Sequence, residues 1–165
     1  MWWNDYFAKI IEPYLTLLNS LPKVALGPII IIWSGAGIKS IIIMALLIST
    51  IISIIDIYQG FINTDKNKIK LMKTFKATKF KILKKLIFPS NINTIVSVLK
   101  VNISMSLIGV IMGEFLVSKE GIGYLIMYGS QIFNLNLVIA GIIILSIISI
   151  IMYYLVKIIE NKITK

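Results

Sequence analysis

The stretch that decides the fold is SIIIMALLISTIISIIDIYQG, residues 40–60, which carries no charge before Asp56. Because an α-helix rises about 1.5 Å per residue, roughly 20 such residues cross the hydrocarbon core of a bilayer. The whole chain is similar in character, since 58% of its 165 residues are hydrophobic, 15% are charged and its mean hydropathy is +0.91. A soluble domain has about 45–50% apolar and about 25% charged residues. The composition therefore predicts an integral membrane protein.

Working outward from this stretch, we expect one all-α transmembrane domain over residues 1–165, a polytopic helical bundle of about four spans. The predicted spans are residues 21–37, 40–60, 92–117 and 137–156. The first is a weak and kinked span, because Pro22, Gly27 and Pro28 interrupt it. Residues 123–133 read as a short interfacial or re-entrant helix ahead of the last span.

Positive charge is concentrated between two of the predicted spans. Residues 66–85 hold nine lysines and no acid, and the chain has a net charge of +10. Lys157, Lys162 and Lys165 follow the last span, so a cytoplasmic position for both clusters satisfies the positive-inside rule. Apolar residues recur at three- and four-residue spacings through residues 63–88, which indicates an amphipathic helix or helix pair that Pro89 ends. Nucleic acid is not an expected partner, because no arginine and few aromatic side chains are interleaved with the lysines.

Several classes of enzyme are excluded by what the sequence lacks. It contains no cysteine and no histidine, which removes disulfides, thiolate metal clusters, cysteine nucleophiles and histidine bases. No glycine-rich phosphate loop followed by Lys-Ser/Thr is present, so any ATP must be bound by another subunit. An intramembrane enzyme would need converging ionisable groups, yet Asp56 and Glu114 are predicted near opposite membrane faces. We expect no catalytic residue, no metal site and no cofactor.

The stretch LMKTFKATKFKILKKLIFP, residues 71–89, resembles the cytoplasmic coupling motif of binding-protein-dependent ABC importer permeases. Two hallmarks of that motif differ, because its acidic position falls on Lys70 and its glycine on Lys76. The resemblance implies a segment, residues 63–89, that docks on a cytoplasmic ATP-binding subunit. The implied docking residues are Met72, Phe75, Lys76, Ala77, Thr78, Leu83 and Pro89. From the residues alone, a basic loop held against anionic lipids is an equal alternative.

Two more stretches resemble the permeases for nitrate, sulfonate, taurine and pyrimidine-type thiamine precursors. They are LPKVALGPIIIIWSGAG, residues 21–37, and VLKVNISMSLIGVIMGEFLVSKEGIGYLI, residues 98–126. The resemblance implies a multi-pass permease of the bacterial plasma membrane, with an ATP-binding subunit, an extracytoplasmic substrate-binding protein and a second permease copy as partners. Such permeases have two further spans before the point where this chain starts. A truncated, non-transporting membrane protein or a small anchoring bundle is therefore the alternative function.

Two pairs of residues within the 92–117 span are candidate functional positions. Lys100 and Glu114 are about 14 residues, or about 21 Å, apart along a helix and cannot pair with each other. Lys100 either snorkels to the inner interface or serves the pathway, and Glu114 either caps or packs a helix or takes part in gating. Gly109 and Gly113 form a small-residue face that serves either packing within the chain or a homodimer contact.

Overall fold

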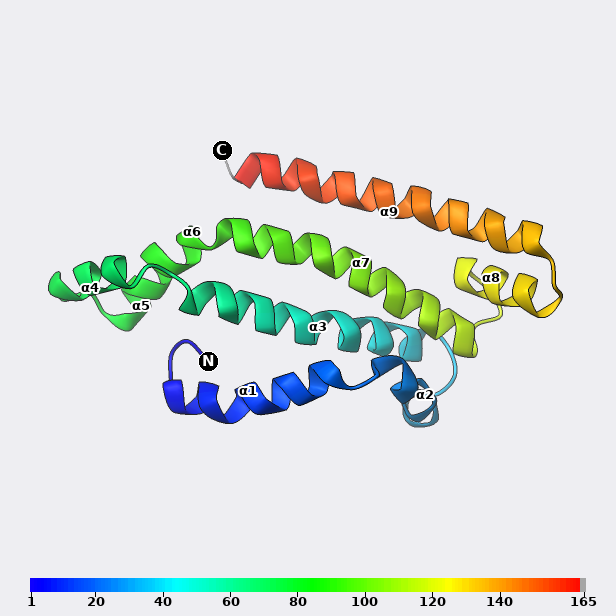
Figure 1. Ribbon diagram of the computed structural model, residues 1–165, viewed down its shortest axis with the longest axis horizontal. Helices are drawn as coiled ribbons and strands as arrows, with labels where there is room; N and C mark the ends of the chain where they lie inside the picture. Colours follow the sequence, from blue (N-terminus) through cyan, green and yellow to red (C-terminus); the bar gives the residue numbers. More distant parts are fainter. Residues whose placement is uncertain (164–165) are drawn as a thin grey trace.

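Three long helices dominate the computed structural model, which describes residues 1–163 and contains no strand within that range. They are α3 (Ile38–Ile62), α7 (Ile92–Val117) and α9 (Leu135–Ile163), each long and apolar enough to cross a membrane. α7 packs against both α3 and α9, and the three helices alternate in direction (Figure 1). The all-α membrane fold that the sequence predicted is confirmed.

The core of the molecule lies where α3 meets α7. Met44 and Ser40 of α3 are completely or almost completely buried, as are Val96 and Val98 of α7. In contrast, α9 exposes almost all of its apolar surface, and side chains such as Ile143 are half exposed along it. Apolar side chains that are unfavourable in water are suited to contact with lipid tails, so this exposure fits a helix that borders the bilayer.

The weak, kinked span predicted over residues 21–37 is not one continuous helix in the structure. The chain instead forms α1 (Asp5–Ser20), a 3₁₀ turn (Lys23–Leu26) and α2 (Gly27–Ser34), with a bend of 86° between α1 and the following segment. The eight residues of α2 reach only about 12 Å, far short of a bilayer. α1 lies along α3 (Figure 1), so it and α2 together form at most one broken span.

The lysine-rich segment, residues 63–89, forms two short helices on either side of a turn, as the second of the two predicted alternatives, a helix pair, had it. These are α4 (Lys66–Thr74) and α5 (Lys79–Ile82), and α5 continues through a π-helical turn (Leu83–Ile87) into α6 (Phe88–Ser90). Pro89 therefore does not end the helix as expected. It lies in α6 directly after the π-helical turn, and the helix continues past it to Ser90.

At the opposite end of the molecule, α8 (Ile122–Gln131) packs on α9 and on the end of α7. It occupies nearly the residues for which a short re-entrant helix was predicted. The end of α9 lies on the same side as the lysine-rich segment (Figure 1), as the charge distribution predicted. Lys165 of the C-terminal lysine cluster lies outside the described residues, and so does the side chain of Lys162.

Candidate functional site

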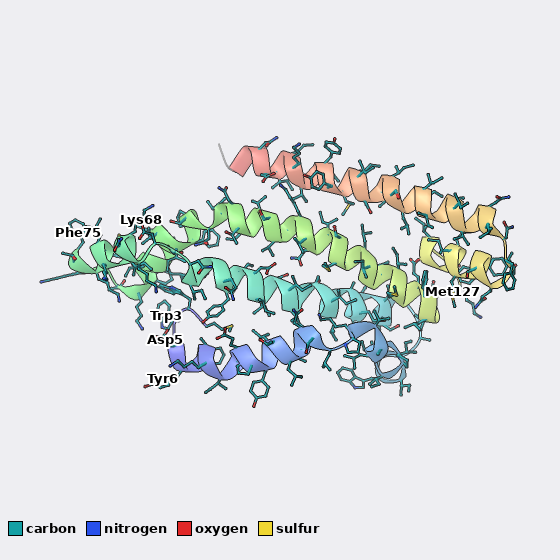
Figure 2. The ribbon with its side chains drawn as sticks, viewed as in Figure 1. Trp3, Asp5, Tyr6, Lys68, Phe75 and Met127 are labelled. Carbon is teal, nitrogen blue, oxygen red and sulfur yellow. The ribbon has the colours of Figure 1, made fainter. Side chains whose placement is uncertain are left out.

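The turn between α4 and α5 is the most exposed apolar feature of the lysine-rich segment. Phe75 lies at its tip and is 74% exposed, with Leu71 and Phe80 also largely exposed beside it. Figure 2 shows Phe75 at the end of the molecule formed by the lysine-rich segment, away from the long helices. Lysines surround this tip, so an aromatic side chain stands in water within a strongly positive surface. Such a side chain is poorly placed unless another surface covers it.

The shape of the tip is determined by how α4 ends. Lys76 has a φ of +53°, in the left-handed region that favours glycine. The Ala77 N–H donates to the Met72 carbonyl at 3.1 Å and the Lys76 N–H donates to the Lys73 carbonyl at 2.9 Å. These are the two hydrogen bonds of a Schellman motif, which commonly has glycine at this position. A glycine at this position, as in the coupling motif that this segment resembles, would adopt the same φ without a Cβ penalty.

The seven predicted docking residues do not form one surface. Met72, Phe75, Lys76, Ala77 and Thr78 gather around the tip, where Thr78 also accepts a hydrogen bond from the Lys81 N–H at 3.4 Å and caps α5. Leu83 instead lies in the π-helical turn and lines a groove beside Trp3 and Phe61. Pro89 lies further along the chain, in α6. The tip is the candidate docking surface, and the other two residues belong to the stem that joins it to α7.

Lys100 does not extend alone to the interface. Its Nζ lies 2.6 Å from a carboxylate oxygen of Glu160, and it also lies 5.8 Å from the centre of the Tyr153 ring. The Lys100 and Glu160 side chains are 24% and 28% exposed, so the pair is partly shielded from water. This ion pair ties the first third of α7 to the end of α9. Sequence reasoning missed Glu160, although an acid three residues after Lys157 in the last turns of an apolar helix was a usable signal.

Glu114 acts as a helix cap. Its Oε2 accepts a hydrogen bond from the Gly123 N–H at 2.6 Å, at the first turn of α8. A carboxylate there satisfies a free backbone donor and complements the positive end of the helix dipole. Gly121, with a φ of +106°, lies against the same carboxylate, where a side chain would collide with it. Of the two alternatives for Glu114, the geometry supports capping.

The glycine face of α7 is occupied within the chain. A Cβ atom on Gly109 would lie 2.5 Å from the Cα of Ala45, and one on Gly113 would lie 3.0 Å from the Cα of Ile41. Both glycines therefore allow the backbones of α3 and α7 to approach closely. Packing within the chain, rather than a homodimer contact, explains this pair.

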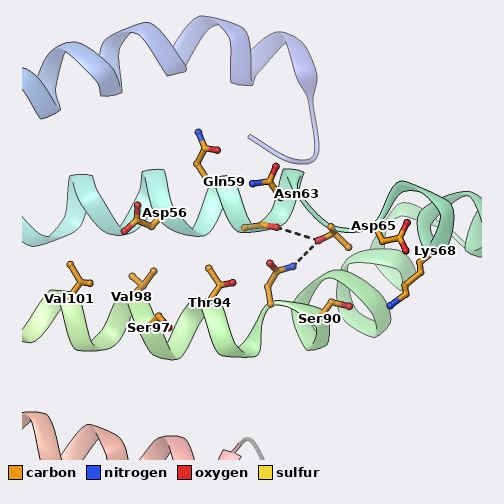
Figure 3. A pocket seen from close by; sticks show the side chains of 13 residues that line it. Asp56, Gln59, Asn63, Asp65, Lys68, Ser90, Thr94, Ser97, Val98 and Val101 are labelled. Carbon is orange, nitrogen blue, oxygen red and sulfur yellow. Dashed lines mark hydrogen bonds between the residues drawn. The ribbon is translucent and has the colours of Figure 1, made fainter.

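A polar cavity that the sequence analysis did not identify opens between α3 and α7 near the lysine-rich segment (Figure 3). Its wall is fixed by Asn91, whose Nδ2 donates to the Thr64 Oγ1 and to the Ile87 carbonyl, both at 2.8 Å. Asn91 is the N-cap residue of α7, but its side chain makes these contacts instead of capping that helix. The signal that could have revealed the cavity was the polar spacing of Asp56, Gln59 and Asn63 through the last turns and C-cap of α3.

Comparison with known proteins now identifies the chain. The family described as "Binding-protein-dependent transport system inner membrane component" matches residues 1–165. The chain belongs to this family. The predicted family and the multi-pass location in the plasma membrane are thereby confirmed, since this is an inner-membrane family and three helices can span a bilayer.

Curated members of the transport family are similar over most of this chain. A "Probable ABC transporter permease protein" of Haemophilus influenzae is 30% identical over 89% of the chain and 60% of its own length. The "Formylaminopyrimidine transport permease protein ThiX" of Halalkalibacterium halodurans is 29% identical over 98% of the chain and 64% of its own length. A "Putative aliphatic sulfonates transport permease protein SsuC" of Bacillus subtilis is 25% identical over 94% of the chain and 56% of its own length. The chain thus spans about three-fifths of these relatives.

Proposed function

We propose that this chain is the membrane-spanning permease subunit of a bacterial ABC importer, which moves a small nutrient using ATP hydrolysed by a separate subunit. Family membership supports the general assignment, and the exposed Phe75 tip is the observation that carries the docking role. In this proposal the chain itself performs no chemical reaction. It supplies a pathway and a mechanical link.

The tip suits a groove on a cytoplasmic protein better than it suits a lipid surface. Phe75 in the turn, Leu71 in α4 and Phe80 in α5 form an exposed apolar cluster, which is suited to insertion into a hydrophobic groove on a partner. Lysines around it would pair with an acidic rim on the partner. Since family members work with an ATP-binding subunit, that subunit is the proposed occupant. This assignment also places the lysine-rich end of the molecule in the cytoplasm.

The connection from the tip to the spans supports a mechanical role. α5 runs through the π-helical turn and α6 to α7 with no long flexible linker. α7 is held to α3 by the close backbone contact at Gly109 and to α9 by the Lys100–Glu160 ion pair. Closure of the ATPase dimer would push on the tip and tilt α7 together with its neighbours, which is a rigid-body transition. Lys100 then acts in transmitting this motion rather than in binding solute.

The remaining partners follow from the same proposal. An extracytoplasmic binding protein delivers the solute, a second copy of the permease completes the pathway, and lipid covers α9. The solute classes are a sulfonate, nitrate, taurine or a thiamine-precursor pyrimidine, and two of the relatives carry names of these kinds.

Co-purification from native membranes tests the proposal. A chain tagged after Lys165 should retain an ATP-binding subunit in mild detergent, and Phe75→Asp should remove that subunit while the bundle stays folded. Phe133→Asp is the matched control, because Phe133 is 92% exposed and lies in the loop between α8 and α9, at the other end. If the subunit is retained by Phe75→Asp, the docking role is refuted. Retention that depends only on lysine number and salt would support lipid contact instead.

A further inference from the structure

The polar cavity between α3 and α7 is not explained by docking or by packing. It has a volume of about 600 Å³ and is lined by polar groups that recur at helical spacing on both helices. α3 contributes Asp56 and Gln59, its C-cap residue is Asn63, and α7 contributes Thr94 and Ser97; Figure 3 labels all five. Val98 and Val101 line its deeper end, away from the lysine-rich segment.

This polar surface is unsuited to lipid. Asp56 lies six residues before the end of α3, which is about 9 Å along the helix axis. Charged groups at such positions in membrane proteins face a bundle interior or an aqueous cavity, because lipid cannot solvate them. Gln59 and Ser97 are exposed on the same side, and they too need water or a hydrogen-bonding solute. The cavity therefore belongs to an aqueous compartment that opens at the lysine-rich end.

The charges of the cavity select against anions. Three charged residues line it, and two of them, Asp65 and Lys68, carry opposite signs at its mouth. Asp56 is the innermost charge and has no salt-bridge partner among the described residues. Apart from Lys68, the lysines of the lysine-rich segment are absent from the lining. A bound anion would face the Asp56 carboxylate, whereas an amine or an uncharged donor could hydrogen-bond to it.

We propose that this cavity is a solute-binding compartment for a neutral or cationic, hydrogen-bonding solute of the amino-heterocycle class, with Asp56 as the residue that disfavours sulfonate and nitrate. The proposal rests on the proposed function, because it places the compartment on the cytoplasmic half of the transport pathway. Of the solute classes proposed above, only the thiamine-precursor pyrimidine then remains. Amide and hydroxyl groups from Gln59, Asn63, Thr94 and Ser97 supply both donors and acceptors for a heterocycle that carries an amino group.

The absence of cysteine from the sequence gives a direct test. Ser97→Cys places a single thiol in the cavity, and Ser146→Cys places one on the exposed face of α9 as the matched control. In inside-out vesicles that contain the complete importer, charged methanethiosulfonate reagents should modify the first variant and not the second. Modification is measured by mass on this chain alone. If Ser97→Cys reacts only with a membrane-permeant maleimide, the cavity is not aqueous and the proposal is overturned.

The charge of the reagent tests Asp56. Relative to their rates with a free thiol, the cationic reagent should modify Ser97→Cys about tenfold faster than the anionic one at low salt. Adding Asp56→Asn should abolish most of that preference while the thiol stays reactive. Equal rates in the presence of Asp56, or a preference for the anionic reagent, would overturn the selection role.

Protection by solutes tests the ligand class. 4-Aminopyrimidine should slow the modification of Ser97→Cys in a concentration-dependent way, and methanesulfonate should not. Protection by methanesulfonate alone would overturn the proposal. The same vesicles report on the ATP-binding subunit by co-purification, so the two failures are distinguishable. If the subunit is retained but 4-aminopyrimidine does not protect, the cavity is refuted as a solute site and the permease assignment stands. If 4-aminopyrimidine protects but no subunit is retained, the cavity stands as a solute site and the permease assignment is refuted.

Discussion

Substituting Gly109 by alanine should destabilise the contact on which the fold depends most. The new Cβ would lie 2.5 Å from the Cα of Ala45, 3.0 Å from its N and 3.2 Å from its Cβ. Ordinary carbon–carbon contacts are about 3.5–4.0 Å, so α3 and α7 must separate by about 1 Å at this crossing. Overpacking of this kind typically costs about 1–3 kcal/mol. We therefore expect the free energy of unfolding to fall by that amount.

The assay is thermal unfolding of the detergent-solubilised chain, followed by size-exclusion of the fluorescently tagged protein. For a chain of this size, each kcal/mol corresponds to a shift of about 2–4 °C in Tm. Ser104→Ala is the control, because Ser104 is an exposed residue of the same helix and should leave Tm unchanged. A Tm for Gly109→Ala equal to that of the control would refute the close approach of the two helices.

A second-site substitution sharpens the argument. The two shortest contacts of the added Cβ are with backbone atoms of Ala45, and only the third is with its side chain. Ala45→Gly removes that side chain but leaves the backbone in place. It should therefore fail to restore the Tm of Gly109→Ala. A full rescue would show that the collision involves side chains and that the helix backbones lie further apart than the structure indicates.

Three further predictions concern the other contacts. Lys76→Gly should stabilise the turn after α4 by about 1 kcal/mol, because glycine adopts a φ of +53° without a Cβ penalty. Hydrogen exchange of the backbone amides at the tip should therefore slow. Faster exchange would contradict this prediction. Lys100→Met and Glu160→Gln should show a coupling of about 1 kcal/mol in a double-mutant cycle read by Tm, and strictly additive effects would rule out the ion pair. Glu114→Gln should keep much of the α8 cap, because the glutamine side-chain carbonyl still accepts a hydrogen bond. Glu114→Ala should lose the cap and speed hydrogen exchange over residues 122–131. Equal hydrogen exchange in the two variants would exclude the cap.

The strongly apolar parts of the fold were readable from sequence. α7 spans the predicted residues 92–117, and α3 exceeds its predicted bounds by only two residues at each end. Uninterrupted apolar runs leave little choice in a bilayer, because every backbone group must be satisfied within the helix. Residues 21–37 were predicted only as a weak, kinked span for a related reason. Their composition is apolar, but Pro22 and Pro28 divide the backbone into short pieces, and composition alone cannot give the 86° bend.

In the candidate site, too, some features were predictable from sequence and others were not. The lysine-rich segment could be found from spacing and charge, and Phe75 was implied by the resemblance to a coupling motif, because both depend on residues close together in sequence. The left-handed turn at Lys76 could be anticipated only as a departure from a related motif, since lysine gives no local signal for a positive φ. The partners of Lys100 and Glu114 could not be assigned, although both residues were identified as candidates.

Sequence by itself determined the membrane class, the approximate positions of the three long apolar helices, and the end of the molecule that gathers positive charge. These are properties of composition and short-range periodicity, and they act through transfer of side chains between water and lipid. Tertiary structure alone decided that Glu160 neutralises Lys100, that Glu114 caps α8, that Gly109 faces Ala45, and that Asp56 shares a cavity with Ser97. Each of these contacts depends on how two helices are rotated and how they cross. Side-chain packing between the helices fixes that arrangement, and the sequence of either helix alone does not contain it.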